Sequence, residues 1–291
     1  MNLIKASLIA FLLQLAVYEA LTRYEYWTFV DAENQWIRNY IIAQGYIYDH
    51  ADAPVVIAGS SLSARLNPYL LSRETFNLSF PGLSPFDGVN IVLAAHTHPR
   101  AVFIEANSLI RNSDPDFDNG MRSPWLLAVR RWMMSLRDFA RPVTLVKTYL
   151  RDRTWAFLVG DSRTDVQSAT SKANANVIFD RLLANQKRNY AAPLSKDAQA
   201  KLITELGVNI AALEQRGIRV VFFEMPMNPA LCETSLQASI RNLVRTRFPA
   251  EPYFRIGDCN VIMTEDGVHL SYREAEPVTR EFAEIVRQAI H

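Results

Sequence analysis

The stretch PVVIAGSSLS at residues 54–63 decides the fold. It begins with a short, continuous apolar run, which is typical of a strand buried on both faces of a parallel sheet. Similar runs recur at AVFIEA (101–106), IRVVFFE (218–224) and YFRIG (253–257). Stretches with helical character alternate with these runs. The alternation predicts an α/β domain of three layers, in which helices cover both faces of a mostly parallel sheet.

Two helices are predicted in the last third of the chain. Residues 197–215 have helical periodicity, with Ser195 placed to cap the start and Gly217 to end the helix. Residues 273–290 form the final helix by the same criteria. No unit of roughly 20 to 50 residues repeats along the chain, which excludes solenoids and propellers.

An insertion at about residues 111–193 does not fit the alternating pattern. Residues 111–124 (RNSDPDFDNGMRSP) are rich in turn formers and are predicted to be a loop. Residues 154–193 are polar and only weakly periodic. Insertions in α/β proteins often cover the functional site, and an uninvolved surface excursion is the alternative.

The amino terminus carries the apolar run LIKASLIAFLLQLAVYEAL at residues 3–21. A hydrocarbon core of ~30 Å needs ~20 apolar residues, so the run is just long enough to span. No small-x-small cleavage pattern follows it. Residues 1–27 are therefore predicted to be an uncleaved signal anchor and transmembrane helix, and residues 28–291 a single α/β domain.

Charges and aromatic residues give the anchor a direction. Lys5 is expected to stay on the cytoplasmic side, and Tyr24, Tyr26 and Trp27 are expected at the far interface. This orientation predicts a membrane-anchored protein whose domain is extracytoplasmic. The alternative is an amphipathic first helix docked on the domain, because Gln14 and Glu19 interrupt the apolar run.

Composition excludes several classes of protein. About half of the 291 residues are hydrophobic (49%), so the chain can bury a core. Its 31 Lys and Arg residues against 30 Asp and Glu leave a net charge of +1, which argues against a nucleic-acid partner. Cys232 and Cys259 are too few for a cysteine-rich scaffold or an all-cysteine zinc site.

The serines that follow the first strand are candidates for chemistry. Ligands of open parallel sheets bind at the carboxyl ends of the strands, and a serine on a tight strand-to-helix turn is exposed there. Ser61 is therefore a candidate nucleophile. The alternative is that Gly59, Ser60 and Ser61 form an ordinary helix cap or an anion-binding turn.

Asp266 and His269 could activate such a serine. They stand three residues apart, after the strand at 253–257 and before the last helix. A serine hydroxyl needs a base to accept its proton, and the base needs an acceptor that fixes its tautomer. His96 and His98 form a His-Thr-His pair without a third ligand, so neither a metal centre nor a cofactor is predicted.

Four short blocks, in order along the chain, resemble those of the SGNH (GDSL-like) hydrolase superfamily. They are Gly59-Ser60-Ser61-Leu62, Asn77 to Gly82, Glu105-Ala106-Asn107 and the pair Asp266 and His269. The resemblance implies that Ser61 is the nucleophile, that His269 moves its proton and that Asp266 orients the imidazole. It also implies that the oxyanion is held by the Ser61 N–H, the Gly82 N–H and the Asn107 side-chain amide.

The blocks also depart from the family's pattern. Ser60 stands in place of the usual aspartate of the first block, and Glu105 and Ser108 replace glycine and aspartate in the third. Glu105 could bring a negative charge close to the oxyanion site, where it would oppose the developing charge unless it is turned away.

A membrane-tethered domain with a Gly-Ser-Ser first block is similar to extracytoplasmic proteins that acylate cell-envelope polysaccharides, such as alginate O-acetyltransferase relatives. The resemblance implies an acyl donor, a glycan acceptor and a membrane-bound acyltransferase partner, in the periplasm if the source is bacterial. Acyl transfer and ester hydrolysis share the acyl-enzyme step, so both remain open. The alternatives are a catalytically inactive glycan-binding protein and a membrane-tethered scaffold.

Residues 122–153 form a basic stretch interleaved with aromatic residues. Arg130, Arg131 and Arg137 are predicted to bind an acidic glycan acceptor. Two alternatives are open: the stretch lies on an anionic bilayer, or it is a helical flap whose charges are simply solvated.

Cys232 follows the strand at 218–224, and Cys259 follows the strand at 253–257. If these strands are neighbours, both thiols lie at one edge of the sheet, and an oxidising compartment would join them in a disulfide. The alternative is two unrelated buried thiols.

Overall fold

A computed structural model describes residues 3–24, 32, 34–146 and 169–290, so Tyr26, Trp27 and residues 147–168 of the predicted insertion lie outside the described part. The chain divides into two compact units. The first comprises Met1–Asp49 and Asn119–Thr164, and the second comprises His50–Asp118 and Asp165–His291.

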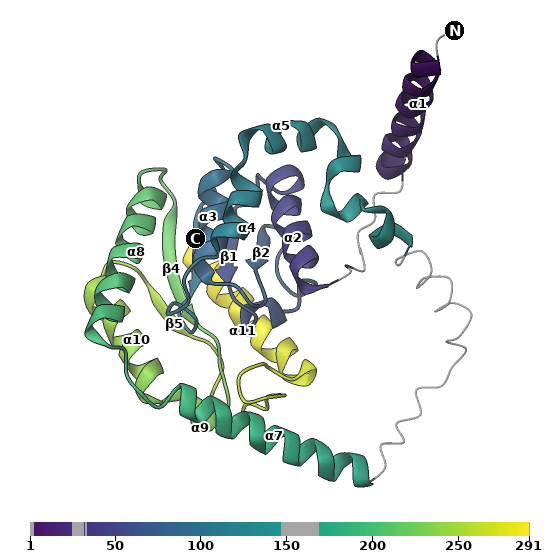
Figure 1. The fold of residues 1–291 in the computed structure, drawn as a ribbon. Helices are drawn as coiled ribbons and strands as arrows, with labels where there is room; N and C mark the ends of the chain where they lie inside the picture. Colours follow the sequence, from purple (N-terminus) through teal and green to yellow (C-terminus); the bar gives the residue numbers. More distant parts are fainter. Residues whose placement is uncertain (1–2, 25–31, 33, 147–168, 291) are drawn as a thin grey trace. The chain divides into compact units, whose positions relative to one another are not determined.

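The second unit contains a five-stranded, all-parallel sheet (Figure 1). Its strands are β1 (Val55–Gly59), β2 (Thr75–Ser79), β3 (Ala101–Glu105), β4 (Arg219–Glu224) and β5 (Tyr253–Arg255). The order is β2-β1-β3-β4-β5, which confirms the predicted α/β class. β2 was not predicted: its sequence TFNLS is only half buried, as suits an edge strand, and it has no continuous apolar run.

Alternate side chains of the strands point to opposite faces, and each face is covered. Phe103 and Phe223 meet Phe282 of α11 (Tyr272–Ile290) on one face, with ring centroids 5.6 and 4.9 Å apart. On the other face α3 (Pro85–Ala94) comes so close to β1 that a Cβ at Gly88 would lie 3.0 Å from the Ala58 Cβ. The domain is therefore a three-layer α/β/α structure.

The predicted late helices are confirmed. α8 (Lys196–Glu214) begins where expected, since the Ser195 hydroxyl accepts the Ala198 N–H at 3.2 Å. Gly217 follows with φ +71°, a left-handed conformation that favours glycine. α9 (Pro229–Cys232) and α10 (Ser235–Arg247) come after β4.

The prediction of a loop over residues 111–124 is wrong. α4 (Pro115–Arg122) and α5 (Pro124–Trp132) begin at the two prolines of that stretch. Proline is well suited to the first position of a helix, and the Asp114 carboxylate accepts the Asp116 and Phe117 N–H groups as a cap. The residues that predicted turns are here the start signals of helices. α7 (Ala169–Asn189) forms the described end of the insertion.

The first unit contains α1 (Leu3–Tyr24), α2 (Gln35–Asp49) and the short 3₁₀ helices η2 (Met134–Leu136) and η3 (Asp138–Ala140). α1 is long and apolar enough to cross a membrane, as an anchor or as a signal sequence. α2 and η3 are joined by the Gln44 side-chain amide, which donates to the Asp138 carboxylate at 2.5 Å and accepts the Asp138 N–H at 2.8 Å.

Candidate active site

The turn after β1 lies at the carboxyl edge of the sheet, beside the end of β3. In the observed strand order this is the topological switch point, where connections leave β1 and β3 in opposite directions and where open α/β sheets generally bind their ligands. Gly59 is required at the end of β1, because a Cβ there would lie 1.8 Å from the Ser63 hydroxyl. Ser61 lies on this turn at the switch point, and its side chain is only partly buried.

Ser61, His269 and Asp266 form a continuous hydrogen-bonded chain. His269 Nε2 is 2.8 Å from Ser61 Oγ, and His269 Nδ1 is 2.6 Å from Asp266 Oδ2. With a neutral imidazole and an ionised carboxylate, Nδ1 carries the proton and Nε2 accepts the serine hydroxyl. Residues 208 positions apart therefore meet in the geometry that serine activation requires.

The Asp266 carboxylate is held in its charged form. Burial alone would raise its pKa, but hydrogen bonds from the His269 ring and from the His269 and Val268 N–H groups outweigh burial and lower the pKa to about 2. The two N–H groups donate to Oδ1 at 2.8 and 3.1 Å, which leaves Oδ2 for the imidazole. Asp266 is thus an anion at any pH well above its pKa of about 2.

The loop that carries this pair is fixed on both sides. Gly267 has φ +98°, and a Cβ there would lie 2.9 Å from the Leu183 side chain of α7. The predicted insertion therefore packs directly on the Asp266–His269 turn. On the other side, Glu265 forms an ion pair with Arg65, which follows the serine turn, at 2.8 Å.

The two main-chain N–H groups of the predicted oxyanion hole make no hydrogen bond within the described part of the chain. Ser61 N–H and Gly82 N–H have no hydrogen-bond acceptor among the described residues. Gly82 has φ +84° and lies just beyond β2, whose end Ser79 pairs with Gly59 of β1. Both donors therefore follow the carboxyl ends of adjacent strands, as the sequence predicted for an oxyanion hole.

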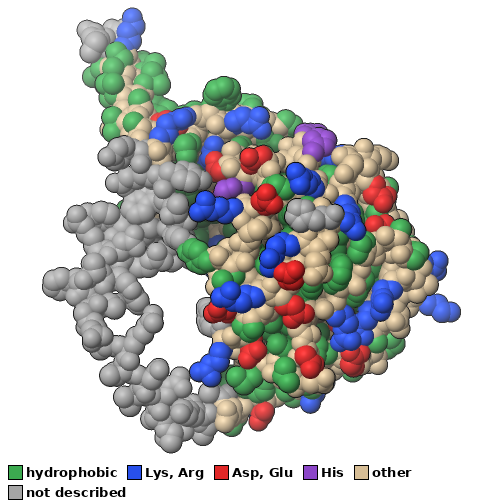
Figure 2. All heavy atoms as spheres, turned by 180° about the vertical axis from the view of Figure 1, so that it is seen from behind, with side chains coloured by type: hydrophobic (Ala, Val, Ile, Leu, Met, Phe, Trp, Pro, Cys, Tyr) green, Lys and Arg blue, Asp and Glu red, His purple; other side chains and the backbone are tan. Residues whose placement is uncertain are grey.

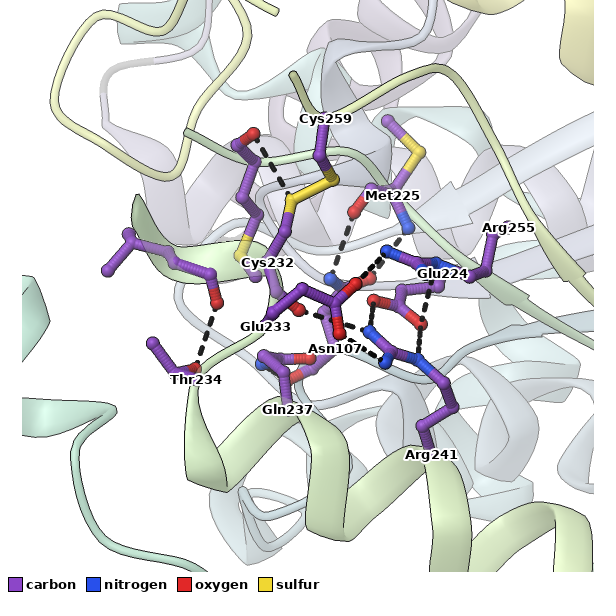
Figure 3. Close-up of polar contacts among 12 residues, drawn as sticks. Asn107, Glu224, Met225, Cys232, Glu233, Thr234, Gln237, Arg241, Arg255 and Cys259 are labelled. Atoms are coloured by element: carbon purple, nitrogen blue, oxygen red, sulfur yellow. Dashed lines mark hydrogen bonds and ion pairs between the residues drawn. A yellow bond between two sulfur atoms is a disulfide. The ribbon is translucent and has the colours of Figure 1, made fainter. Parts of the chain in front are cut away.

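The Asn107 side chain is engaged with the main chain of Met225. Its Nδ2 donates to the Met225 carbonyl at 3.0 Å, and its Oδ1 accepts the Met225 N–H at 2.7 Å (Figure 3). The side chain is buried and fastens the end of β3 to the end of β4. An amide nitrogen carries two hydrogens, so one remains for a substrate oxygen, and the oxyanion role of Asn107 stays a prediction.

Glu105 is turned away from the predicted oxyanion donors. Its fully buried carboxylate accepts the N–H groups of Ser60 and Ser63, at 2.9 and 3.1 Å, and both of their hydroxyls at 2.6 Å. The Ser79 and Ser108 hydroxyls bond to those of Ser63 and Ser60. Four donors thus satisfy the carboxylate and clamp the residues on either side of Ser61.

If Ser61 is the nucleophile, Glu105→Gln should lower kcat about 10- to 100-fold. The side-chain NH₂ of glutamine is a donor, and it would face donors of Ser60 or Ser63 that now bond to a carboxylate oxygen. The turn that carries Ser61 would therefore shift. KM for a small ester should change little. The measurement is steady-state kinetics with thermal unfolding in parallel. Glu74→Gln, an exposed residue before β2, is the matched control. A variant with unchanged kcat would show that the clamp does not position Ser61.

The predicted disulfide between Cys232 and Cys259 is present (Figure 3). The two Cα atoms are 6.3 Å apart, and the bridge joins the segment after β4 to the segment that leads from β5 towards Asp266. Beside it lies a cluster of charged residues in which Glu224 and Arg241 are buried and Glu233 is exposed. Arg241 donates to both oxygens of Glu224 at 2.7 and 2.9 Å and to Glu233 at 2.9 Å. These contacts tie α10 to the end of β4 and to the segment that follows it.

Removing the bridge by Cys232→Ser with Cys259→Ser should lower the free energy of unfolding by about 3 to 4 kcal/mol, because a closed loop of 27 residues is released in the unfolded chain. Urea unfolding of the full chain in detergent measures the difference. A reductant should destabilise the parent by a similar amount and leave the double variant unchanged. Equal stability of the oxidised parent and the variant would contradict the prediction.

The basic residues predicted to bind substrate behave differently from one another. The prediction for Arg137 is wrong, since its guanidinium is 6% exposed, pairs with Asp49 at 3.0 Å and lies over the Tyr48 ring. Arg130 is also tied internally, to the Leu136 carbonyl and to Asp138. Arg131 is exposed. Charged side chains that look solvated in sequence here hold the first unit together.

No protein-family model matches the chain, and no curated protein matches its sequence. Within the described residues, no group of three or more His, Cys, Asp or Glu side chains could hold a metal ion.

Proposed function

We propose that this chain is an SGNH-type serine enzyme that transfers an acyl group, most simply acetyl, to a cell-envelope or exported polysaccharide or removes it from one. The observation that carries the proposal is the hydrogen-bonded chain from Ser61 through His269 to Asp266 at the switch point of the sheet. Two unpaired N–H groups on adjacent strand ends support it. Fold alone would not, since one fold hosts many activities.

In the proposed first step, Ser61 Oγ attacks the carbonyl carbon of an acyl ester while its proton passes to His269 Nε2. The carbonyl oxygen becomes an oxyanion, which the Ser61 and Gly82 N–H groups stabilise. Asp266 stabilises the imidazolium that forms. The intermediate then collapses: the bond to the donor oxygen breaks, that oxygen takes the proton from His269, and an acyl-serine remains.

In the second step a sugar hydroxyl or water attacks the acyl-serine. His269 accepts the proton of the attacking oxygen, which bonds to the acyl carbon. The bond between that carbon and Ser61 Oγ then breaks, and His269 gives the proton to Oγ, so that the free serine is restored. A sugar acceptor makes the enzyme a transferase, and water makes it an esterase. A membrane-bound acyltransferase would be the partner that delivers the acyl group.

We place the catalytic unit outside the cytoplasm, periplasmic in a bacterium, with α1 as its membrane anchor. The disulfide supports this location, because such bonds persist in oxidising compartments. Lys5 at the start of α1 supports the same orientation.

The test uses the full chain in detergent with p-nitrophenyl acetate. We expect p-nitrophenol release, and an acetyl group on the peptide containing Ser61 when the reaction is stopped in acid and digested. Addition of an acidic oligosaccharide should yield acetylated sugar if the enzyme is a transferase. Absence of both the acyl-serine and ester turnover would contradict the proposal and favour an inactive glycan-binding protein or scaffold.

A further inference from the structure

Residues 124–146 of the first unit, here called the apolar strip, expose an unusual number of large apolar side chains. α5 within it has no buried residue, and Trp125 and Trp132 are 69% and 76% exposed. Leu136, Val143 and Val146 are also exposed. Two exposed tryptophans with nearby aliphatic side chains are characteristic of a surface that meets a partner.

The apolar strip is hydrogen-bonded to the last two turns of α1. The Glu19 carboxylate accepts the N–H groups of Met134 and Ser135 at 3.0 and 2.9 Å. Arg23 donates to the Trp132 carbonyl at 2.5 Å, and the Tyr18 hydroxyl donates to the Ala140 carbonyl. All these residues belong to the first unit. Side chains of α1 thus satisfy main-chain groups of the strip that would otherwise need water.

The position of these hydrogen bonds along α1 determines how deep the apolar strip would lie in a membrane that α1 spans. At ~1.5 Å per residue, the 22 residues of α1 measure ~33 Å, close to the ~30 Å of a hydrocarbon core. Glu19 and Arg23 lie in the last six residues of α1, so the hydrocarbon core of a membrane that α1 spans would end near these two residues. Figure 2 shows hydrophobic side chains along the visible length of α1, and Leu8, Phe11 and Leu12 are among those that are more than half exposed. The strip that Glu19 and Arg23 hold must then lie at the boundary between hydrocarbon and headgroups.

We propose that the apolar strip rests in the interface of a phospholipid bilayer beside the end of α1. Trp125 and Trp132 provide amphipathic rings of the kind that gather at this depth, and the exposed Arg131 can meet lipid phosphates. The inference rests on α1 spanning the membrane and not on the catalytic proposal. It gives the first unit a role of its own, a second membrane contact that restricts the unit's motion about the anchor.

The experiment reconstitutes the full chain into vesicles of phosphatidylcholine with a minority of phosphatidylglycerol, prepared with or without brominated acyl chains. Bromine quenches tryptophan emission only at close range. We expect brominated lipid to dim the parent, and this loss of emission to shrink in Trp125→Phe with Trp132→Phe. Trp36→Phe, on α2, is the matched control and should keep the full loss.

Two further measurements test separately whether α1 spans the membrane and whether the double variant is folded. Alkaline carbonate should fail to extract the parent and the double variant, since α1 remains in both; release of the parent would overturn the inference. Thermal unfolding of the double variant should match the parent. Equal quenching in the parent and the double variant would also overturn it, and would leave the apolar strip to a protein partner or a second copy of the chain.

Discussion

Ser61→Ala should abolish ester turnover, lowering kcat by about three to six orders of magnitude. The reason is that, in the proposed mechanism, Ser61 Oγ forms the covalent bond to the acyl group, and no other described hydroxyl lies within hydrogen-bond distance of His269 Nε2. Steady-state hydrolysis of p-nitrophenyl acetate by the full chain measures the loss. The acetylated peptide should vanish together with the activity.

The substitution should leave folding intact. The Ser61 side chain is partly exposed, and His269 is its one hydrogen-bond partner among the described residues. Ser72→Ala is the matched control, because it removes an exposed hydroxyl that bonds only to Thr75. Full activity in Ser61→Ala would refute Ser61 as nucleophile. Loss of activity with loss of secondary structure would show a structural role instead.

The parts of the fold that could be predicted are those whose signal is local. Three of the five strands, β1, β3 and β4, contain continuous apolar runs, and the parallel arrangement follows because helices separate these strands. The juxtaposition of Ser61 with Asp266 and His269 follows in turn, since the carboxyl ends of parallel strands share one edge. The disulfide could be predicted for the same reason, because β4 and β5 are neighbours.

The rest depends on contacts that one-dimensional patterns do not carry. β2 lacks an apolar run because one of its faces stays partly exposed at the sheet edge. α4 was mistaken for a loop because a capping Asp114 and a first-turn proline look like turn residues. From the sequence, the Glu105 charge was expected to threaten the oxyanion site, because only the structure shows the four hydrogen-bond donors that surround its carboxylate. Arg137 was predicted to bind a glycan acceptor, because its actual partner, Asp49, lies 88 positions away in the sequence.

Asp266→Asn should lower kcat by about two to four orders of magnitude while KM changes little. An asparagine can keep the N–H bonds from Val268 and His269 with its oxygen, so the loop should persist. Its NH₂ would then face Nδ1 and favour the tautomer with the proton on Nε2, which cannot accept the serine proton. The negative charge that stabilises the imidazolium would also be lost.

The same substitution makes a prediction about stability and pH. Because folding lowers the pKa of Asp266 from its ordinary 3.8 to about 2, the carboxylate stabilises the fold above pH 4, and this contribution is lost as the pH falls towards 2. Urea unfolding should therefore show Asp266→Asn less stable than the parent at pH 6, with the difference shrinking by pH 2. Asp258→Asn, which replaces an exposed aspartate of the segment that leads to this loop, is the matched control for the loss of one carboxylate. A kcat equal to that of the parent would remove Asp266 from the mechanism. A pH-independent stability difference would mean instead that the variant disturbs the loop itself, because the effect of losing a charge must shrink as the parent carboxyl takes up its proton.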